Sequence, residues 1–418
     1  MIIHVIQHGE TIASIAGSYG VSAERIILDN GISDPDSLVV GESIVILFPE
    51  IIYIIKEGDT LDSIAESYGT TVIQLLRNNP YLSDREYIYP GEEIVIRYRE
   101  NKMHSITTNG FAYPFINKDI LKRTLPFLTR LTIYSYAATA DGDINDIDDT
   151  EIIRMAKAYG TAPIMMLMAS SDNMEEEIRM MHLILSNAEA IDRLINRLLD
   201  ILQTKGYSGV CINIPYIYPA DRSLYQDFTI KITDRITNAG YKVFGTLGAP
   251  TAGLDYGSLI RDVAGITLIV YEFGYSEGLP PGTLSMDTYR QLLADLITLV
   301  PPEKTSIGIP VMGYLWSLPY IPGSSRGMAL SYDAAINLAA INNAEIQFDP
   351  TTNAAAFYYL SGNEYIVRFW DARSMDNFIS FVPEFGLDGI GIWNIMYWFP
   401  QLWMVVNSQY EINSDPVR

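Results

Sequence analysis

The chain has 418 residues, 48% of them hydrophobic and 11% aromatic, and its 50 acidic and 28 basic side chains give a formal net charge of −22. This composition supports a large buried core, and the length exceeds that of one ordinary domain unless the domain is a barrel. The negative charge argues against nucleic acid and anionic lipid as partners, because such partners bind clustered Lys and Arg. Neutral glycans remain possible ligands.

Residues that commonly bind metals or cofactors are few or scattered. Cys211 is the only cysteine, so disulfides within the chain and thiolate-rich metal sites are excluded. Residues 141–146 begin like a calcium-binding loop, but Asp146 and Ile152 occupy the positions where such a loop has Gly and Glu. The four histidines lack metal-ligand spacing; they are His4, His8, His104 and His182. We therefore expect neither a metal nor a cofactor.

The N-terminal residues run directly into a strand-like pattern. They contain no basic segment, apolar core or small-residue cleavage site of the kind found in a signal peptide. No apolar stretch reaches the length of a membrane span. We expect synthesis in the cytoplasm without a signal peptide, and we expect no membrane-spanning segment.

The first hundred residues contain an internal repeat. The run Gly9-Glu10-Thr11-Ile12 recurs 49 residues later as Gly58-Asp59-Thr60-Leu61, and apolar residues at helical spacing follow each run. Each copy predicts a short strand (4–7; 53–56), a helix with Thr at its N-cap, a second helix (23–28; 72–77) and a last strand (43–47; 93–97). A period of this size indicates tandem modules with the order strand, helix, helix, strand.

This pattern resembles the LysM module over residues 2–48 and 52–98. LysM modules bind N-acetylglucosamine-containing glycans in a groove between the first turn and the loop before the last strand. In the second copy the resemblance places the groove at Gly58, Asp59, Thr60, Leu61, Asn79, Pro80, Tyr81 and Ile88. In the first copy it places the groove at Gly9, Glu10, Thr11, Ile12, Asn30, Gly31 and Ile32, where Gly31 replaces the family's Pro. The alternative is that the Gly, Asp and Thr residues only form turns and helix caps.

From about residue 101, apolar runs of strand length alternate with helical patterns such as the one at 187–203. The eight runs span 105–113, 131–136, 163–168, 210–214, 243–247, 266–271, 307–312 and 389–393. They predict an α/β fold in which residues 101–418 form a (β/α)8 TIM barrel. Between the seventh and eighth runs, residues 318–369 predict a small α+β insertion with a helix at 332–341 and strands at 355–360 and 364–369.

Four short motifs give the barrel a family resemblance. They are Ile309-Pro310-x-x-Gly313-Tyr314-x-Trp316, Ile346-Gln347-Phe348-Asp349, Asp371-Ala372-Arg373-Ser374 and Gly391-Ile392-Trp393-Asn394. Together they resemble the spore-associated branch of glycoside hydrolase family 18, which contains chitinases and spore-cortex N-acetylglucosaminidases and often carries N-terminal LysM pairs. The resemblance implies a location in the spore coat or cortex after synthesis in the mother cell. It also implies peptidoglycan, cortex or chitin-like glycans as ligands, with spore coat proteins as further partners.

The fourth strand departs from the family pattern D-G-x-D-x-D-x-E. Its four acidic positions are occupied by Ser208, Cys211, Asn213 and Pro215. In the family the final Glu protonates the glycosidic oxygen and the middle Asp orients the 2-acetamido group of the substrate. Because Pro215 and Asn213 cannot perform these roles, the resemblance implies a catalytically degenerate barrel. Glu272, at the end of the sixth strand, is the alternative acid.

The aromatic residues of the barrel mouth are better preserved. Flat rings at strand ends suit the apolar faces of sugars. The resemblance places a glycan-binding set at Asn213, Tyr271, Glu272, Tyr314, Trp316 and Trp393. The sequence thus favours a glycan-binding protein without turnover. Two alternatives stay open: an active N-acetylglucosaminidase that uses a displaced acid, and a coat-assembly scaffold without glycan affinity, which closure of the LysM grooves by the barrel would indicate.

Overall fold

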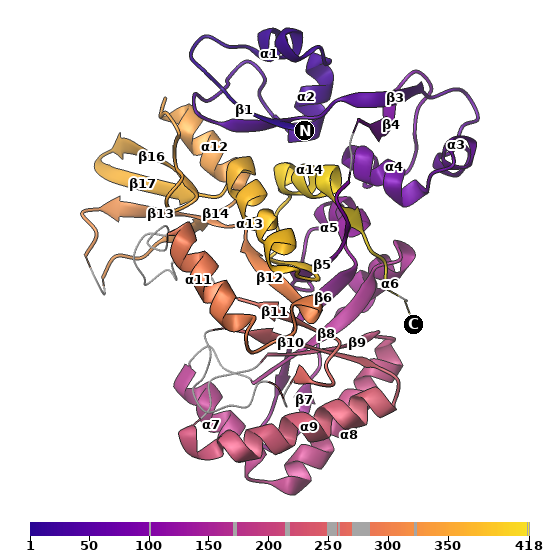
Figure 1. Ribbon diagram of the computed structural model, residues 1–418, viewed down its shortest axis with the longest axis vertical. Coiled ribbons are helices and arrows are strands. Elements are labelled where there is room, and N and C mark those ends of the chain that lie inside the picture. Colours follow the sequence, from indigo (N-terminus) through magenta and orange to yellow (C-terminus); the bar gives the residue numbers. More distant parts are fainter. Residues whose placement is uncertain are drawn as a thin grey trace.

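A computed structural model describes residues 1–99, 102–169, 174–213, 218–248, 257, 260–269, 285–321, 324–415 and 417. Two small N-terminal modules lie at one end of the molecule, next to a large barrel (Figure 1). A small sheet with one helix extends from the barrel beside the first module. Within the described ranges, no helix is both long and apolar enough to cross a bilayer.

Each N-terminal module has the predicted order of strand, helix, helix and strand. Module 1 contains β1 (Ile2–Val5), α1 (Ile12–Tyr19), α2 (Ala23–Asn30) and β2 (Ser43–Ile46). Module 2 contains β3 (Pro49–Ile54), α3 (Leu61–Tyr68), α4 (Val72–Asn78), the 3-10 helix η1 (Pro80–Leu82) and β4 (Glu93–Tyr98). In both modules the two strands pair antiparallel. The first strands end earlier than the sequence suggested, because the turn that leads to the first helix already starts at their last predicted residues.

The local sequence explains where the first helices begin and end. Thr11 and Thr60 each accept a hydrogen bond from the backbone of the serine three residues later, and that serine bonds back, which forms a capping box. Gly20 and Gly69 end these helices with φ of 68° and 63°. Glycine is favoured there because a Cβ is strained at positive φ.

Eight parallel strands form a closed barrel, as predicted. They are β5 (Ser105–Ala112), β6 (Arg130–Ala138), β8 (Ala162–Ala169), β9 (Gly209–Asn213), β10 (Lys242–Leu247), β11 (Gly265–Leu268), β12 (Thr305–Pro310) and β18 (Gly389–Trp393). Each strand pairs with the next, and β5 closes the circle by pairing with both β6 and β18. Buried side chains of Phe111, Ile164, Met166, Cys211 and Phe244 fill the interior. The barrel is therefore a packed core, with function expected at the carboxyl ends of its strands.

Helices surround the barrel (Figure 1). They are α5 (Lys118–Thr124), α6 (Thr150–Ala158), α7 (Met174–Leu185), α8 (Ala188–Lys205), α9 (Arg222–Asn238), α11 (Met286–Leu296), α13 (Ala372–Phe385) and α14 (Pro400–Gln409). Shorter elements connect them: η2 (Leu125–Phe127), β7 (Ile144–Asn145), η3 (Pro219–Asp221), η4 (Pro302–Lys304) and β19 (Glu411–Ile412). Helix α8 buries one apolar face that includes Leu194, Leu198 and Leu202, as its sequence periodicity predicts.

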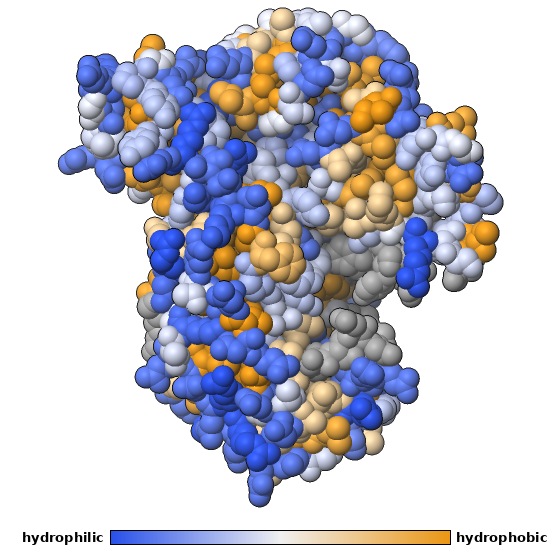
Figure 2. Space-filling model, turned by 180° about the vertical axis from the view of Figure 1, so that it is seen from behind, coloured by the Kyte–Doolittle hydropathy of each residue, from blue (hydrophilic) through white to orange (hydrophobic). Residues whose placement is uncertain are grey.

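The insertion after β12 is a five-stranded antiparallel sheet with one helix. Its elements are β13 (Gly313–Leu318), β14 (Met328–Leu330), α12 (Tyr332–Ile341), β15 (Gln347–Asp349), β16 (Ala354–Ser361) and β17 (Asn363–Phe369). The sheet begins before residue 318 because β13 pairs with β17, with Tyr314 opposite Arg368. Figure 2, which views the molecule from behind, shows hydrophobic residues on the side of this insertion.

A buried polar network joins the two modules. The Nε atom of Arg25 on α2 donates to Asp29 at 2.7 Å, and its Nη1 atom donates to the side-chain oxygen of Asn79 in module 2 at 3.3 Å. The hydroxyl of Tyr98, on β4, donates to Asp29 at 3.1 Å. Burial disfavours the Arg25 cation, but the adjacent Asp29 carboxylate holds the pKa of Arg25 above its ordinary value. The network therefore fixes module 1 to module 2 through charge-assisted hydrogen bonds.

Module 2 is in turn fixed to the barrel. Arg77 on α4 donates to the carbonyl of Pro126 at 2.6 Å, and Arg123 on α5 pairs with Asp84 at 2.7 Å. The side chain of Asn407 on α14 donates to Asn78 at 3.1 Å. The three parts thus meet at one junction, and we expect them to behave as one unit.

We predict that Arg25→Ala destabilises the chain by about 3–5 kcal/mol, because the substitution leaves the buried Asp29 carboxylate without its cation. Urea-induced unfolding followed by circular dichroism measures the loss. Arg97→Ala is the matched control, since Arg97 pairs with Glu50 on an exposed surface and such pairs contribute at most about 1 kcal/mol. Equal losses in both variants would contradict this account of the junction.

Candidate functional site

The fourth barrel strand presents an amide at the barrel mouth. Asn213 is the last residue of β9, and its Oδ1 atom accepts a hydrogen bond from the hydroxyl of Thr246 on β10 at 2.6 Å. The Nδ2 group of Asn213 makes no hydrogen bond to another described residue, and an amide nitrogen carries two N–H donors. Asn213 therefore offers N–H donors where the family pattern has a carboxylate.

The other substituted positions on this strand differ in their surroundings. Cys211 lies inside the apolar barrel core, and burial raises the pKa of its thiol to about 12. It is a protonated core residue, as its sequence context suggested. Ser208 precedes β9 and is buried at the opposite, amino end of the strand. Pro215, like Tyr271 and Glu272, lies outside the described residues.

A row of aromatic side chains extends from Trp393 along the barrel rim. Trp393 ends β18 and is half-buried, with the ring centroid of Tyr134 at 4.8 Å and that of Phe111 at 5.5 Å. Tyr134 contacts Tyr113 at 4.9 Å, and Tyr113 stacks on Phe115 at 5.2 Å. The exposed fraction of Phe115 is 77%. The row is thus a graded surface, from a half-buried indole to an exposed phenyl ring, of the kind on which sugar rings pack.

Sequence reasoning missed three members of this row: Tyr113, Phe115 and Tyr134. Tyr113 and Phe115 follow the carboxyl end of β5, and Tyr134 lies on β6. Their position near the carboxyl ends of two barrel strands is the signal that would have identified them.

The two predicted aromatic residues of the insertion have different surroundings. Tyr314, on β13, is half-buried and lies 5.5 Å from the ring of Trp316. Trp316 is fully buried, and its indole packs so closely on Gly327 that a Cβ there would lie 2.6 Å away. The expected ligand contact of Trp316 is therefore corrected, because its side chain is buried and packs on Gly327 and Tyr314.

In both modules the predicted groove asparagines serve the fold. Asn79 accepts from the backbone N–H of Val95 at 2.9 Å and donates to the carbonyls of Val95 and Leu75. Asn30 makes the equivalent three bonds with Val45 and Ile26. Both amides are buried and clamp the last strand of their module to the second helix. Their expected role as groove ligands is corrected, since their polar atoms already have partners.

The acidic residues of the first turns are also engaged. Asp59 accepts from the backbone N–H of Lys56 at 2.7 Å and from the hydroxyl of Tyr53 at 2.8 Å, and these bonds lower the pKa of its carboxyl. Glu10 makes the same kind of contacts with Gln7 and His4. Thr11 and Thr60 cap helices. The side chains of the first turns thus stabilise the turns themselves. Gly9 and Gly58 are exposed, so their backbone is accessible to a ligand.

The remaining groove residues of module 2 surround Tyr81. Its ring lies under the guanidinium groups of Arg25 and Arg85, at 5.6 and 5.2 Å, and its hydroxyl donates to the carbonyl of Glu93. Pro80, Leu61 and Ile88 are half-buried and leave part of their apolar surface accessible.

In module 1, Ile12 belongs to the buried core, whereas Gly31 is exposed and Ile32 half-buried, and both line a pocket. Among the described residues, the side of the predicted module 1 groove formed by Gly31 and Ile32 is therefore not covered by the barrel.

Module 1 contacts the insertion through Glu42. This buried carboxyl accepts a hydrogen bond from the hydroxyl of Tyr332 on α12 at 3.3 Å. Burial raises the pKa of Glu42 to about 7, and the nearby carboxylates Asp333 and Asp371 act in the same direction. A protonated Glu42 suits this interface, because a charge there would be desolvated.

Two family models match the chain. The LysM domain matches residues 4–47 and 53–97, and glycosyl hydrolases family 18 matches residues 98–397. A cortical fragment-lytic enzyme of Bacillus subtilis (strain 168) is 29% identical over 435 residues, which cover all of both chains. The crystal structure of the spore cortex-lytic enzyme SleL of Bacillus cereus superimposes with a TM-score of 0.81 at 25% identity, covering 99% of this chain and 98% of that one. SleL of Bacillus megaterium QM B1551 gives the same TM-score at 24% identity and 99% coverage of both chains.

We predict that Glu42 makes stability depend on pH. The raised pKa means that the folded chain keeps a proton that the unfolded chain loses near pH 4.5, so this contribution is complete below that pH and is lost as the pH rises through about 7. The full effect is on the order of 3 kcal/mol. The contribution of Glu42 raises the melting temperature at pH 5 relative to that at pH 8. In Glu42→Gln the difference between these two melting temperatures should therefore be smaller than in the unmodified chain. Glu24→Gln, at an exposed position of α2, is the control; an unchanged profile in Glu42→Gln would refute the assignment.

Proposed function

Because this chain belongs to glycosyl hydrolase family 18 and carries two LysM modules, we propose that it binds an N-acetylglucosamine-containing glycan without cleaving it. The glycan class is that of peptidoglycan, spore cortex or chitin. The net charge of −22 is compatible with neutral sugars and unfavourable for polyanions. The names of the relatives support the cortex as the setting and the spore envelope as the location.

The observation that carries the proposal is the chemistry at the end of β9. Hydrolysis of this family type needs a general acid and a carboxylate that stabilises the positively charged intermediate. Asn213 supplies an amide whose oxygen is already bonded to Thr246, and Pro215 has no ionisable group. Loss of a general acid alone costs about 10² to 10⁴ in rate.

Binding has its own support in the described residues. The aromatic row from Trp393 to Phe115 offers flat apolar surface, and Asn213 offers N–H donors at the carboxyl end of β9. Apolar faces with a few polar groups that fix orientation are the usual composition of ligand sites. The barrel mouth can thus hold a sugar chain while lacking the groups on β9 that would cleave it.

We predict that the full chain co-sediments with insoluble peptidoglycan and that chito-oligosaccharides release it. Ile88→Glu should weaken this binding, because it places a charge on the half-buried apolar edge of the module 2 groove. Ile52→Glu is the matched control, since Ile52 is 46% exposed on β3 outside the predicted groove. Sedimentation that oligosaccharides do not reverse, or equal weakening by both substitutions, would contradict glycan binding by this groove.

We also predict no release of products from chitin oligomers or cortex muropeptides between about pH 4 and pH 8, the range in which a carboxylic acid can be tuned for general acid work. Chromatography of the reaction mixture against a buffer blank measures this. The double variant Asn213→Asp, Pro215→Glu should gain activity, since the hydroxyl of Thr246 can also donate to a carboxylate at position 213. Hydrolysis by the unmodified chain that disappears in Glu272→Gln would establish the alternative, an enzyme with a displaced acid.

A further inference from the structure

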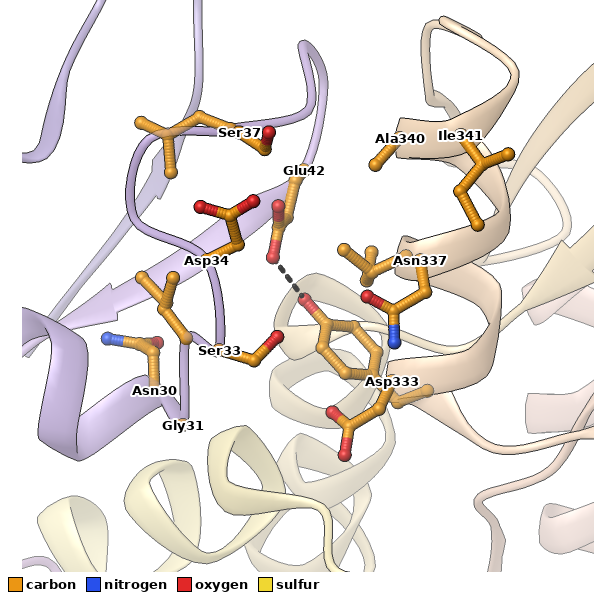
Figure 3. Close-up of a pocket in the computed structure, with 14 residues that line it drawn as sticks. Asn30, Gly31, Ser33, Asp34, Ser37, Glu42, Asp333, Asn337, Ala340 and Ile341 are labelled. Atoms are coloured by element: carbon orange, nitrogen blue, oxygen red, sulfur yellow. Dashed lines mark hydrogen bonds between the residues drawn. The ribbon is translucent and has the colours of Figure 1, made fainter.

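A pocket of about 260 Å³ lies between module 1 and the insertion (Figure 3). One wall is the loop that joins α2 to β2, and the other is one face of α12. The lining residues are Asn30, Gly31, Ile32, Ser33, Asp34, Ser37, Leu38 and Glu42 from module 1, and Tyr332, Asp333, Ile336, Asn337, Ala340 and Ile341 from α12. None of them comes from the first turn, residues 9–12. The pocket is therefore different from a groove between the two loops of module 1.

Hydrogen bonds hold the two walls at a fixed separation. The hydroxyl of Tyr332 donates to Glu42, as the dashed line in Figure 3 shows. The backbone N–H of Ile346 donates to the carbonyl of Val40 at 2.9 Å, and Arg373 donates to the carbonyl of Gly41 at 3.1 Å. The approach at Gly41 is so close that a Cβ would lie 1.8 Å from the carbonyl oxygen of Ile346. The pocket is thus preformed, which lowers the entropic cost of binding.

The lining combines hydrogen-bond acceptors with aliphatic surface. Figure 3 shows Ser33, Asp34 and Ser37 on the module wall facing Asn337 and Ala340 on the helix wall. Aliphatic contacts come from Ile32, Leu38, Ile336, Ala340 and Ile341. The lining contains no Lys, Arg or His, so an anionic ligand would meet carboxylates without a compensating cation. A ligand with several O–H or amide N–H donors and one apolar face matches this wall composition.

We propose that this pocket binds one residue of a neutral N-acetylhexosamine chain, with α12 of the insertion as its second wall. The sugar hydroxyls and the amide N–H donate to Asp34, Asp333 and the Asn337 oxygen, and the acetamide methyl packs on the aliphatic side chains. Ligand pockets commonly measure about 300 to 1,000 Å³, so a volume near 260 Å³ suits one sugar ring. The inference rests on the glycan-binding function proposed above and assigns part of it to a site shared by the module and the barrel.

The test uses titration calorimetry of the full chain with triacetylchitotriose. Asn337→Trp fills the pocket from the α12 side and should remove one binding site per chain, or weaken binding at least tenfold if no other site contributes. Asn337→Ala removes one hydrogen-bonding group with little change in shape and should weaken the same site several-fold. Asn342→Trp is the matched control, because Asn342 ends the same helix outside the lining and should leave binding unchanged.

The outcomes separate this inference from the broader proposal. If the unmodified chain binds the trisaccharide and both Asn337 variants bind it with equal stoichiometry and affinity, the shared pocket is refuted while glycan binding stands. If the unmodified chain gives no binding at millimolar ligand, both are refuted. N-acetylmuramic acid, which carries a carboxylate, should not compete for the site; competition equal to that of N-acetylglucosamine would refute the neutral class of ligand.

Discussion

The buried ion pair between Arg25 and Asp29 is the interaction on which the arrangement of this molecule depends. Each charge would be costly in an apolar junction without the other. The pair lies on α2 of module 1, and its further partners lie in module 2, because Arg25 also bonds to Asn79 and Asp29 accepts from Tyr98. Tandem modules commonly move relative to each other when their interface is small and polar. Here the partners of the pair hold module 1 on module 2, and module 2 is held on α5 and α14 of the barrel.

This rigid arrangement changes what the modules can contribute. A module on a flexible linker would act as an independent anchor, whose effective concentration depends on linker length. A docked module instead presents its loops at a fixed distance from the insertion. The result is a concave site that module 1 and α12 line together. The proposed glycan site therefore belongs to the junction between module 1 and the insertion as much as to either part.

At the barrel mouth, aromatic rings and a general acid place different demands on a hydrolase scaffold. The ring of Trp393 at the end of β18 and that of Tyr134 within β6 need only packing to stay in place, and Phe111 and Tyr113 supply it. A general acid has a stricter requirement, since its pKa must be tuned by its surroundings. On β9 the ionisable positions of the family are replaced by residues that suit a packed strand, and Cys211 contributes directly to the barrel core.

The sequence by itself determined the elements whose signals are local. The repeat near residues 9 and 58 predicted two modules, because Thr caps and left-handed glycines act within one turn of chain. Eight apolar runs predicted the barrel, since a buried parallel strand must be apolar on both faces. The substitutions at 208, 211, 213 and 215 also led to the prediction of a degenerate fourth strand, because the chemistry of a residue type does not depend on the fold, and the loss of activity stays a prediction.

Only the tertiary structure decided which side chains remain available. Asn30 and Asn79 looked like ligands in sequence, but each clamps a strand about 15 residues away. Trp316 looked like part of the site, yet its ring is buried and packs on Gly327. The contact of Glu42 with Tyr332 joins residues 290 positions apart. No periodicity encodes such a pair, because side chains from distant segments meet only after the modules and the barrel have folded and docked.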